Sequence, residues 1–118
     1  MTKILILGGG GMVGQKLANH LLASGLPRHK ALDITLFDMA FPLKQDGRLR
    51  CITGSLTDAQ NITMLAQLRP DLVFHLASIV SGEAESNFDA GWQVNMFTMW
   101  HYLEALKALH IESIRAYV

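Results

Sequence analysis

Cysteine is nearly absent from this chain of 118 residues, and neither charge is in excess. The one cysteine, Cys51, excludes an internal disulfide and is typical of a reducing compartment, and we expect it to be a small buried side chain. Ten basic and ten acidic residues give a net charge of zero, with no Lys/Arg stripe to favour nucleic acid or an anionic membrane. The first apolar run is too short for a signal peptide. We therefore expect a cytoplasmic protein whose partners are small molecules or other proteins.

A metal site is also not predicted. The five histidines are scattered along the chain, and only His101 and Glu104 lie three positions apart on an expected helix. His75 lies in an apolar run, so we expect it to be a hydrogen-bonded residue of the core or of a crevice rather than a catalyst.

Short apolar runs alternate with segments of helical period. Strands are expected at residues 3–7, 33–38, 49–53, 71–77 and 114–118. Helices are expected at about 12–24 and at about 89–110, and another is expected to begin after a cap at Thr57 or Asp58. The buried side of the first helix should carry Val13, Leu17, Leu21 and Leu22, with Gly25 ending it. Right-handed crossovers then give an α/β fold, a Rossmann-type doubly wound parallel sheet of order 3-2-1-4-5, in one domain over 1–118 that stops inside the fifth strand.

A glycine-rich turn, Gly8 to Gly14, directly follows the first expected strand and precedes the first helix. Its glycines allow a tight turn and a close approach of the backbone to a pyrophosphate, toward which the helix directs its free N–H groups. Asp38 ends the second expected strand, where this fold places the carboxylate that binds the adenosine ribose. Met39 and Ala40 follow, with no Arg for a 2′-phosphate, so the pattern favours NAD over NADP.

Five features in register now resemble one family, the extended short-chain dehydrogenase/reductases of the NAD-dependent epimerase/dehydratase group. They are the Gly8/Gly11/Gly14 loop, Asp38, the turn 54–58, the run 73–78 and Val94-Asn95. Within the group, residues 80–89 and Val94-Asn95 are most similar to a branch that oxidises a sugar acid. The resemblance covers the whole chain and implies NAD as the cofactor, and a sugar acid or a nucleotide sugar as the substrate of the parent enzyme.

By position, the resemblance implies a cofactor site and a substrate site. The residues implied for NAD are Gly8, Gly11, Met12 and Val13 at the pyrophosphate, Asp38 at the adenosine ribose, Ser55 and Leu56 at the adenine, and Leu76, Ala77 and Ser78 at the nicotinamide ribose. Asn95 is implied to order the backbone of the site, and Ser81 and Gly82 to hold a substrate carboxylate. The family usually has Asp where Ser55 stands, so the contact to the adenine amino group should be weaker or made by the Ser hydroxyl.

The family's catalytic Tyr-x-x-x-Lys pair is missing. Tyr102 is followed four positions later by Leu106, and no lysine has a tyrosine four positions before it. No catalytic residue is therefore predicted, and the chain is expected to be inactive alone. Three interpretations stay open: the NAD-binding portion of an oxidoreductase, a non-catalytic nucleotide-binding module or inactive epimerase fragment, and a methyltransferase-like adenosine binder, which would lack the three-glycine spacing.

The expected helix 89–110 is apolar almost all round, with large side chains at Trp92, Val94, Met96, Phe97, Met99, Trp100, Leu103, Leu106 and Leu109. This pattern indicates burial on two sides, and the interspersed polar residues exclude a membrane span. In the family this helix enters a dimer bundle, so the resemblance implies a homo-oligomer through residues 89–110.

Overall fold

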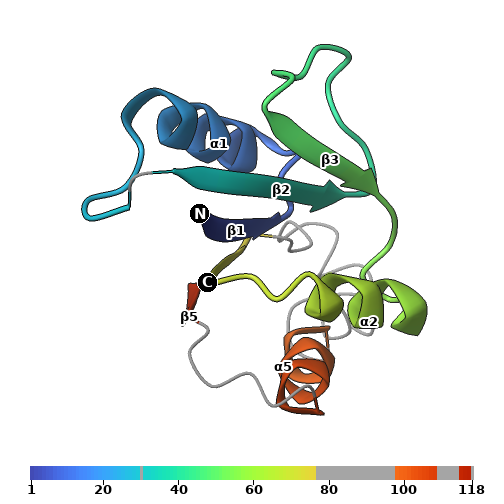
Figure 1. The fold of residues 1–118 in the computed structure, drawn as a ribbon. Helices are drawn as coiled ribbons and strands as arrows, with labels where there is room; N and C mark the ends of the chain where they lie inside the picture. The colour runs from blue at the N-terminus through green and yellow to red at the C-terminus, as the bar shows by residue number, and fades with distance from the viewer. Residues whose placement is uncertain (30, 77–97, 109–114, 118) are drawn as a thin grey trace.

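The computed structural model describes residues 1–29, 31–76, 98–108 and 115–117. Its strands are β1 (Thr2–Leu7), β2 (Leu32–Asp38), β3 (Leu49–Thr53), β4 (Leu72–His75) and β5 (Arg115–Tyr117). Its helices are α1 (Met12–Ser24), α2 (Ala59–Gln67) and α5 (Thr98–Ala108) (Figure 1). These elements agree with those expected from the sequence to within about two residues at each end, except that only part of the helix expected at 89–110 lies in the described residues.

The five strands form one parallel sheet in the order β3-β2-β1-β4-β5, which confirms the predicted topology. Leu7 is in register with Phe37 on one side and with His75 on the other. The carboxyl ends of β1, β2 and β4 therefore lie together at one edge of the sheet. This is the edge at which a doubly wound fold binds its ligands, where the strand order reverses.

Alternate residues of β1 enter two separate cores. Leu5 and Leu7 pack with Phe37 and Val73 beneath α2 and α5, whereas Ile4 and Ile6 pack with residues of β2 and α1 on the opposite face. Figure 1 shows α1 on one side of the sheet and α2 with α5 on the other. The near-continuous apolar sequence of β1 follows from this burial on both faces.

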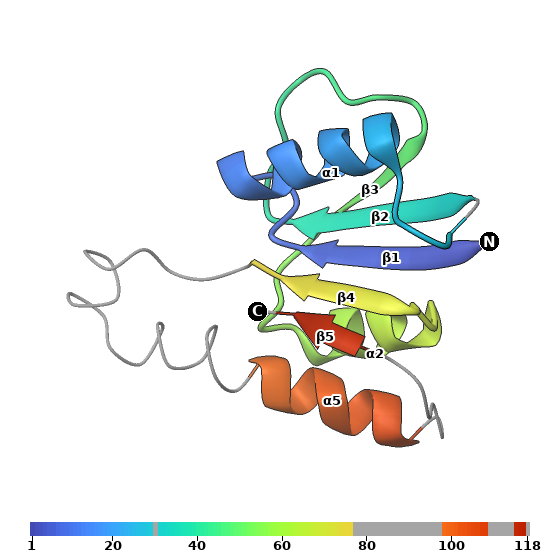
Figure 2. The same cartoon turned by 90° about the vertical axis from the view of Figure 1, so that its left-hand side faces the viewer.

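Helix α1 buries a face slightly different from the predicted one. Leu21 is buried and Leu17 and Leu22 are half-buried against the sheet, but Val13 is 61% exposed, so that its expected burial is wrong. Figure 2 shows that α1 begins beyond the ends of the strands, so its first turn has no sheet beneath it to cover Val13. The predicted stop is confirmed, since Gly25 has a positive φ of 67° that favours glycine.

The expected burial of Cys51 is also wrong, because its thiol is exposed. Cys51 lies on β3, the edge strand next to β2, and its Sγ donates to Gln45 Oε1 over 3.8 Å. Burial of part of the side chain still raises the pKa of the thiol above its ordinary value. A low-pKa reactive cysteine is therefore not supported.

Helix α5 is anchored to α2 by Tyr102. This side chain is buried, and its hydroxyl donates to the carbonyl oxygen of Leu65 over 3.4 Å. On the outer side of α5, Trp100 is 63% exposed and Leu103 47% exposed. Within the described residues, no helix is long and apolar enough to cross a bilayer.

Candidate functional site

The glycine-rich turn is held against the end of β2 by its own backbone. The N–H groups of Gly8 and Gly9 both donate to the carbonyl of Phe37, over 2.8 and 3.2 Å. Gly8 has a positive φ of 87°, a conformation that side chains with a Cβ rarely adopt. The turn therefore leaves β1 sharply and is fixed beside Asp38 before α1 begins.

Two further glycines are required by close packing. A Cβ on Gly14 would collide with the carbonyl oxygen of Gly8, and a Cβ on Gly10 with the carbonyl oxygen of Ala40. Gly14 therefore lets α1 pack closely on the turn, as its place in the predicted spacing requires. Gly10 lets the segment after β2 cross directly over the turn.

Asp38 joins the turn to the end of β2 through its carboxylate. Its Oδ2 accepts from the Gly10 N–H over 2.9 Å, and its Oδ1 accepts from the Met39 N–H over 2.7 Å. Each carboxylate oxygen keeps a second lone pair, because an ionised carboxylate has about four acceptor positions. The half-buried Asp38 can therefore accept further hydrogen bonds from a ligand while its orientation stays fixed.

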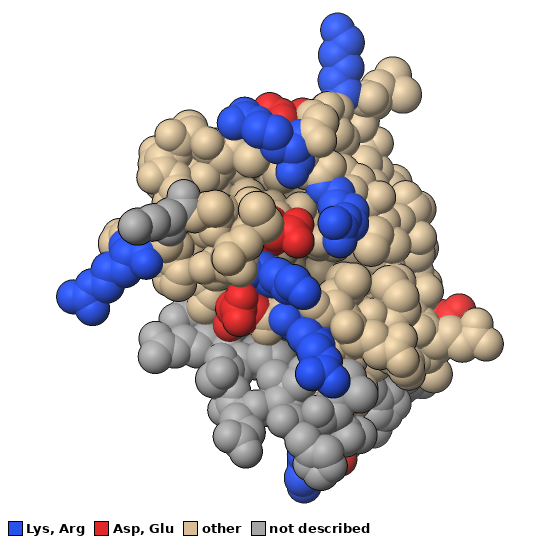
Figure 3. All heavy atoms as spheres, in the orientation of Figure 1, with Lys and Arg blue, Asp and Glu red and all other residues tan. Residues whose placement is uncertain are grey.

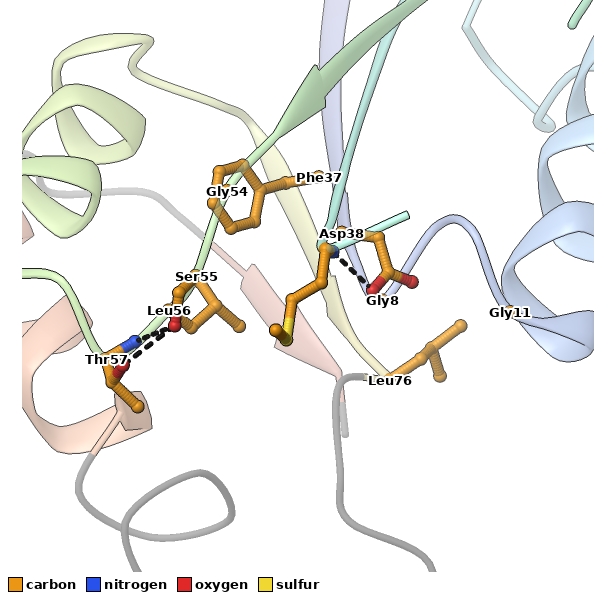
Figure 4. A pocket seen from close by; sticks show the side chains of 10 residues that line it. Gly8, Gly11, Phe37, Asp38, Gly54, Ser55, Leu56, Thr57 and Leu76 are labelled. Carbon is orange, nitrogen blue, oxygen red and sulfur yellow. Dashed lines mark hydrogen bonds between the residues drawn. The ribbon is translucent and has the colours of Figure 1, made fainter. Parts of the chain in front are cut away.

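A cavity of about 230 Å³ opens between the glycine turn, the end of β2 and the turn after β3. It is lined by Gly8, Gly11, Phe37, Asp38, Met39, Gly54, Ser55, Leu56, Thr57 and Leu76 (Figure 4). Asp38 is the only ionisable side chain among these residues. Whole-ligand pockets are typically about 300–1,000 Å³, so this cavity suits one portion of a dinucleotide rather than all of it.

The wall opposite Asp38 is a polar turn between β3 and α2. The Ser55 and Thr57 hydroxyls lie 2.7 Å apart, and the Thr57 N–H donates to Ser55 Oγ. Asn61 reaches back from α2 to donate to the Ser55 carbonyl over 2.9 Å, and Asp58 caps the helix by accepting from the Gln60 N–H, as the sequence predicted. The Ser55 hydroxyl is thus fixed toward Thr57 in the wall of the cavity (Figure 4).

The first turn of α1 provides backbone donors at the same edge. Gly11 is its N-cap, no side chain caps it, and the first turn contains no acidic residue. The first N–H groups of a helix have no partner within it, and the helix dipole makes this end favourable for an anion. This combination fits a phosphate beside Gly11.

Six of the residues predicted for the cofactor lie together around the cavity: Gly8, Gly11, Asp38, Ser55, Leu56 and Leu76. Met12 and Val13 do not line it, and their side chains are exposed, which leaves only their backbone for a contact. Ala77, Ser78, Ser81, Gly82 and Asn95 lie outside the described residues. The lining residues Phe37, Met39, Gly54 and Thr57 were not predicted, although each directly adjoins a residue that was.

His75 is buried at the end of β4, as expected, but its Nδ1 has no hydrogen-bond partner among the described residues, contrary to the expectation of a hydrogen-bonded ring. Burial lowers the pKa of this imidazole, since the charged form is poorly solvated there. Among the described residues, no group of three or more His, Cys, Asp or Glu side chains is placed to hold a metal ion.

Charged side chains of both signs share the surface. Figure 3 shows Lys and Arg side chains with Asp and Glu between them on the face turned to the viewer. Arg48 and Asp46 form an ion pair of 2.8 Å, and the hydrogen bonds from Arg48 hold the pKa of Asp46 at about 2. Because Arg48 is exposed and Asp46 is only half-buried, this pair contributes little to stability.

Comparison with known proteins gives concordant matches. The model of the NAD dependent epimerase/dehydratase family matches residues 4–117. D-erythronate dehydrogenase of Cupriavidus necator is 36% identical over 112 residues, which cover 90% of this chain and 35% of that protein. The nucleoside-diphosphate-sugar epimerase of Agrobacterium tumefaciens has a TM-score of 0.80 at 34% identity, covering 92% of this chain and 33% of that one.

A third match concerns the fold alone. The UDP-glucose 4-epimerase of Thermus thermophilus, solved in complex with NAD, has a TM-score of 0.76 at 22% identity, covering 94% of this chain and 35% of that one. The chain thus spans about a third of the length of these relatives.

Proposed function

The chain belongs to the NAD dependent epimerase/dehydratase family, and from this premise we propose that it is the NAD-binding portion of an extended short-chain dehydrogenase/reductase. The observation that carries the proposal is the carboxylate of Asp38, fixed by Gly10 and Met39 at the mouth of a cavity that the glycine turn borders. Asp38 would accept hydrogen bonds from the adenosine ribose hydroxyls and repel a 2′-phosphate.

The other described residues have distinct parts in this proposal. The pyrophosphate would lie at the first turn of α1, on the backbone of Gly8, Gly11, Met12 and Val13, where no acidic side chain opposes it. The adenine would enter the cavity beside Leu56, with the Ser55 hydroxyl as its polar neighbour. Two features support this assignment: the cavity is smaller than a typical whole-ligand pocket, and Asp38 is the only ionisable side chain among the residues that line it.

The nicotinamide half would lie toward the end of β4. Leu76 borders the cavity there, and its N–H donates to the Leu7 carbonyl over 2.8 Å. Ala77 and Ser78 for the nicotinamide ribose, Asn95 for the backbone of the site, and Ser81 and Gly82 for the substrate remain predictions from sequence.

For the whole enzyme we propose a D-erythronate dehydrogenase-like reaction, the oxidation of a sugar-acid hydroxyl. NAD, when bound, supplies the acceptor for the hydride. The support is the identity to D-erythronate dehydrogenase. The likeness to a nucleoside-diphosphate-sugar epimerase supports one alternative, an inactive epimerase fragment. A non-catalytic nucleotide-binding module is the other alternative.

This chain alone should not catalyse the reaction. Tyr102 has no Lys four positions on, and its hydroxyl is occupied by the Leu65 carbonyl in the core, where burial raises its pKa further from the range of a useful base. We further propose a cytoplasmic protein that forms a homo-oligomer through residues 89–110, for which the exposed Trp100 and Leu103 of α5 offer an apolar contact.

Isothermal titration calorimetry of the purified chain with NAD and with NADP tests the proposal. NAD should bind more tightly, and Asp38→Ala should narrow the difference, because the mutation removes both the ribose acceptor and the repelling charge. Asp33→Ala at the opposite end of β2 is the matched control and should leave both affinities unchanged. Equal affinities for NAD and NADP in the unmutated chain would contradict the proposal. NADH formation from D-erythronate by this chain would contradict its expected inactivity.

A further inference from the structure

The segment that connects β2 to β3, residues 39–48, is tied to α1 by two glutamine side chains. Gln15 Nε2 donates to Gln45 Oε1 over 3.1 Å, and Gln45 Nε2 donates back to Gln15 Oε1 over 3.1 Å. Both side chains are half-buried, so water competes less for these bonds than at an open surface. Figure 2 shows this connecting segment passing beside α1.

Each glutamine also holds a backbone carbonyl. Gln15 Nε2 donates to the Gly9 carbonyl over 2.7 Å, and Gln45 Nε2 donates to the Pro42 carbonyl over 3.3 Å. The pair therefore joins three segments: the glycine turn, the first helical turns of α1, and the far part of residues 39–48. Since a carboxamide has two N–H donors, the donors of both side chains are committed to this one junction.

Few other contacts among the described residues hold the connecting segment. Its tip is exposed at Pro42, Leu43 and Lys44, and Leu43 projects fully into solvent. Phe41 adds a half-buried apolar contact to the core beneath α1, and the Cys51 thiol donates weakly to Gln45 Oε1 over 3.8 Å. The same segment begins with Met39, which adjoins Asp38 at the cavity, and the Ala40 carbonyl lies against Gly10. The part of the segment from Met39 to Gln45 is thus held at both ends. The Asp38 carboxylate accepts from the Met39 N–H at one end, and Gln15 binds Gln45 at the other.

We propose, resting on the function proposed above, that Gln15 and Gln45 are positioning residues for the adenosine half of NAD. The pair keeps residues 39–48 against the glycine turn, so that Asp38 and Met39 stand where the ribose arrives before the cofactor binds. Such preorganisation raises the affinity for NAD, because the segment loses its conformational entropy when the chain folds rather than when the cofactor binds. Neither side chain lines the cavity, so the pair acts through Asp38 and Met39.

Variants Gln15→Met, Gln45→Met and the double variant test this, since Met keeps the length of the side chain and removes its hydrogen bonds. Gln60→Met, an exposed glutamine on α2, is the control. Calorimetry with NAD and with ADP-ribose should give a dissociation constant raised about three- to tenfold in both single variants, the range expected for the loss of one or two hydrogen bonds. Because the two glutamines work as one unit, the dissociation constant of the double variant should be no higher than that of the more weakly binding single variant.

Hydrogen exchange of the unliganded chain gives an answer that does not depend on cofactor binding. The Gly10 and Met39 amides, which both donate to Asp38, should exchange about tenfold faster in the two Met variants, whereas the Gly25 amide at the other end of α1 should not change. Unchanged exchange at Gly10 and Met39 would overturn the inference. So would faster exchange with an unaltered affinity, which would make the pair a structural tie only. Failure of the unmutated chain to bind NAD or ADP-ribose would instead refute the proposed function.

Discussion

The Gly10 N–H and the Asp38 carboxylate lie 2.9 Å apart and form a direct hydrogen bond between the glycine turn and the end of β2. This bond makes two sequence motifs, separated by the whole of α1, into one structural unit. The acid is thereby oriented by the protein itself, at the cavity that the turn borders.

Gly10→Ala should disrupt this unit. The new Cβ would overlap the Ala40 carbonyl, so the segment after β2 has to move away from the turn. We expect the free energy of unfolding to fall by about 1–3 kcal/mol, as for other overpacked sites, together with weaker NAD binding. Urea unfolding and calorimetry measure the two effects. Gly47→Ala, where a Cβ would meet no atom within 4 Å, is the control and should lose neither stability nor NAD affinity. Equal free energies of unfolding and equal NAD affinities in the two variants would refute the close approach at Gly10.

Stability should fall as the pH is lowered past the ordinary pKa of histidine, because of His75. Its pKa is lowered by burial in the folded chain, so the unfolded chain binds a proton first and folding is opposed below about pH 6.5. The slope from one such group is at most about 1.4 kcal/mol per pH unit. Urea unfolding at pH 8, 7, 6 and 5 measures it. His75→Gln should flatten the profile, whereas His20→Gln on the exposed side of α1 should not. An unchanged profile in His75→Gln would rule out this role.

Tyr102 should matter for stability and not for cofactor binding. Tyr102→Phe removes only the long hydrogen bond to Leu65 and should cost about 1 kcal/mol or less. Tyr102→Ala leaves a cavity between α5 and α2 and should cost about 3–5 kcal/mol. Thermal unfolding with and without NAD measures both effects. A large loss of NAD affinity in Tyr102→Phe, at unchanged stability, would indicate a functional hydroxyl instead.

Trp100→Glu should shift the chain toward smaller species if α5 forms a contact between copies. A charge in an apolar interface has no partner and is costly to bury. Light scattering at several protein concentrations measures the size distribution. Gln60→Glu on the exposed side of α2 introduces the same charge outside α5 and should change nothing. An identical distribution for Trp100→Glu and the unmutated chain would exclude Trp100 from any interface.

The sequence predicts the fold and one side of the site because these depend on local patterns. The alternation of strands and helices determines the sheet order, and the spacing of Gly8, Gly11 and Asp38 indicates which strand ends meet. Positions that depend on how far an element extends were mispredicted. Val13 has the period of a core residue but is exposed in the first turn of α1, and Cys51 is exposed on β3, an edge strand of the sheet.

The Gln15–Gln45 pair illustrates what sequence patterns do not contain. The two residues are 30 positions apart, and each has the polarity of an ordinary surface residue. Their contact depends on the path of residues 39–48 across α1, which no periodicity specifies. Met39 and Thr57 were missed for a similar reason, since they reach the cavity only because two separate turns face each other.

We propose above all that NAD binds at the carboxyl edge of the sheet around Asp38, and NMR chemical shifts of the ¹⁵N-labelled chain test this binding site most directly. On titration with NAD, the amides of the glycine turn, Met39 and residues 55–57 should shift together with one dissociation constant. Amides around Lys3 and Arg50, which line a separate cavity of about 300 Å³ on the α2 face, should not shift. Shifts confined to the Lys3 and Arg50 cavity, or no shifts at the glycine turn at saturating NAD, would contradict the account.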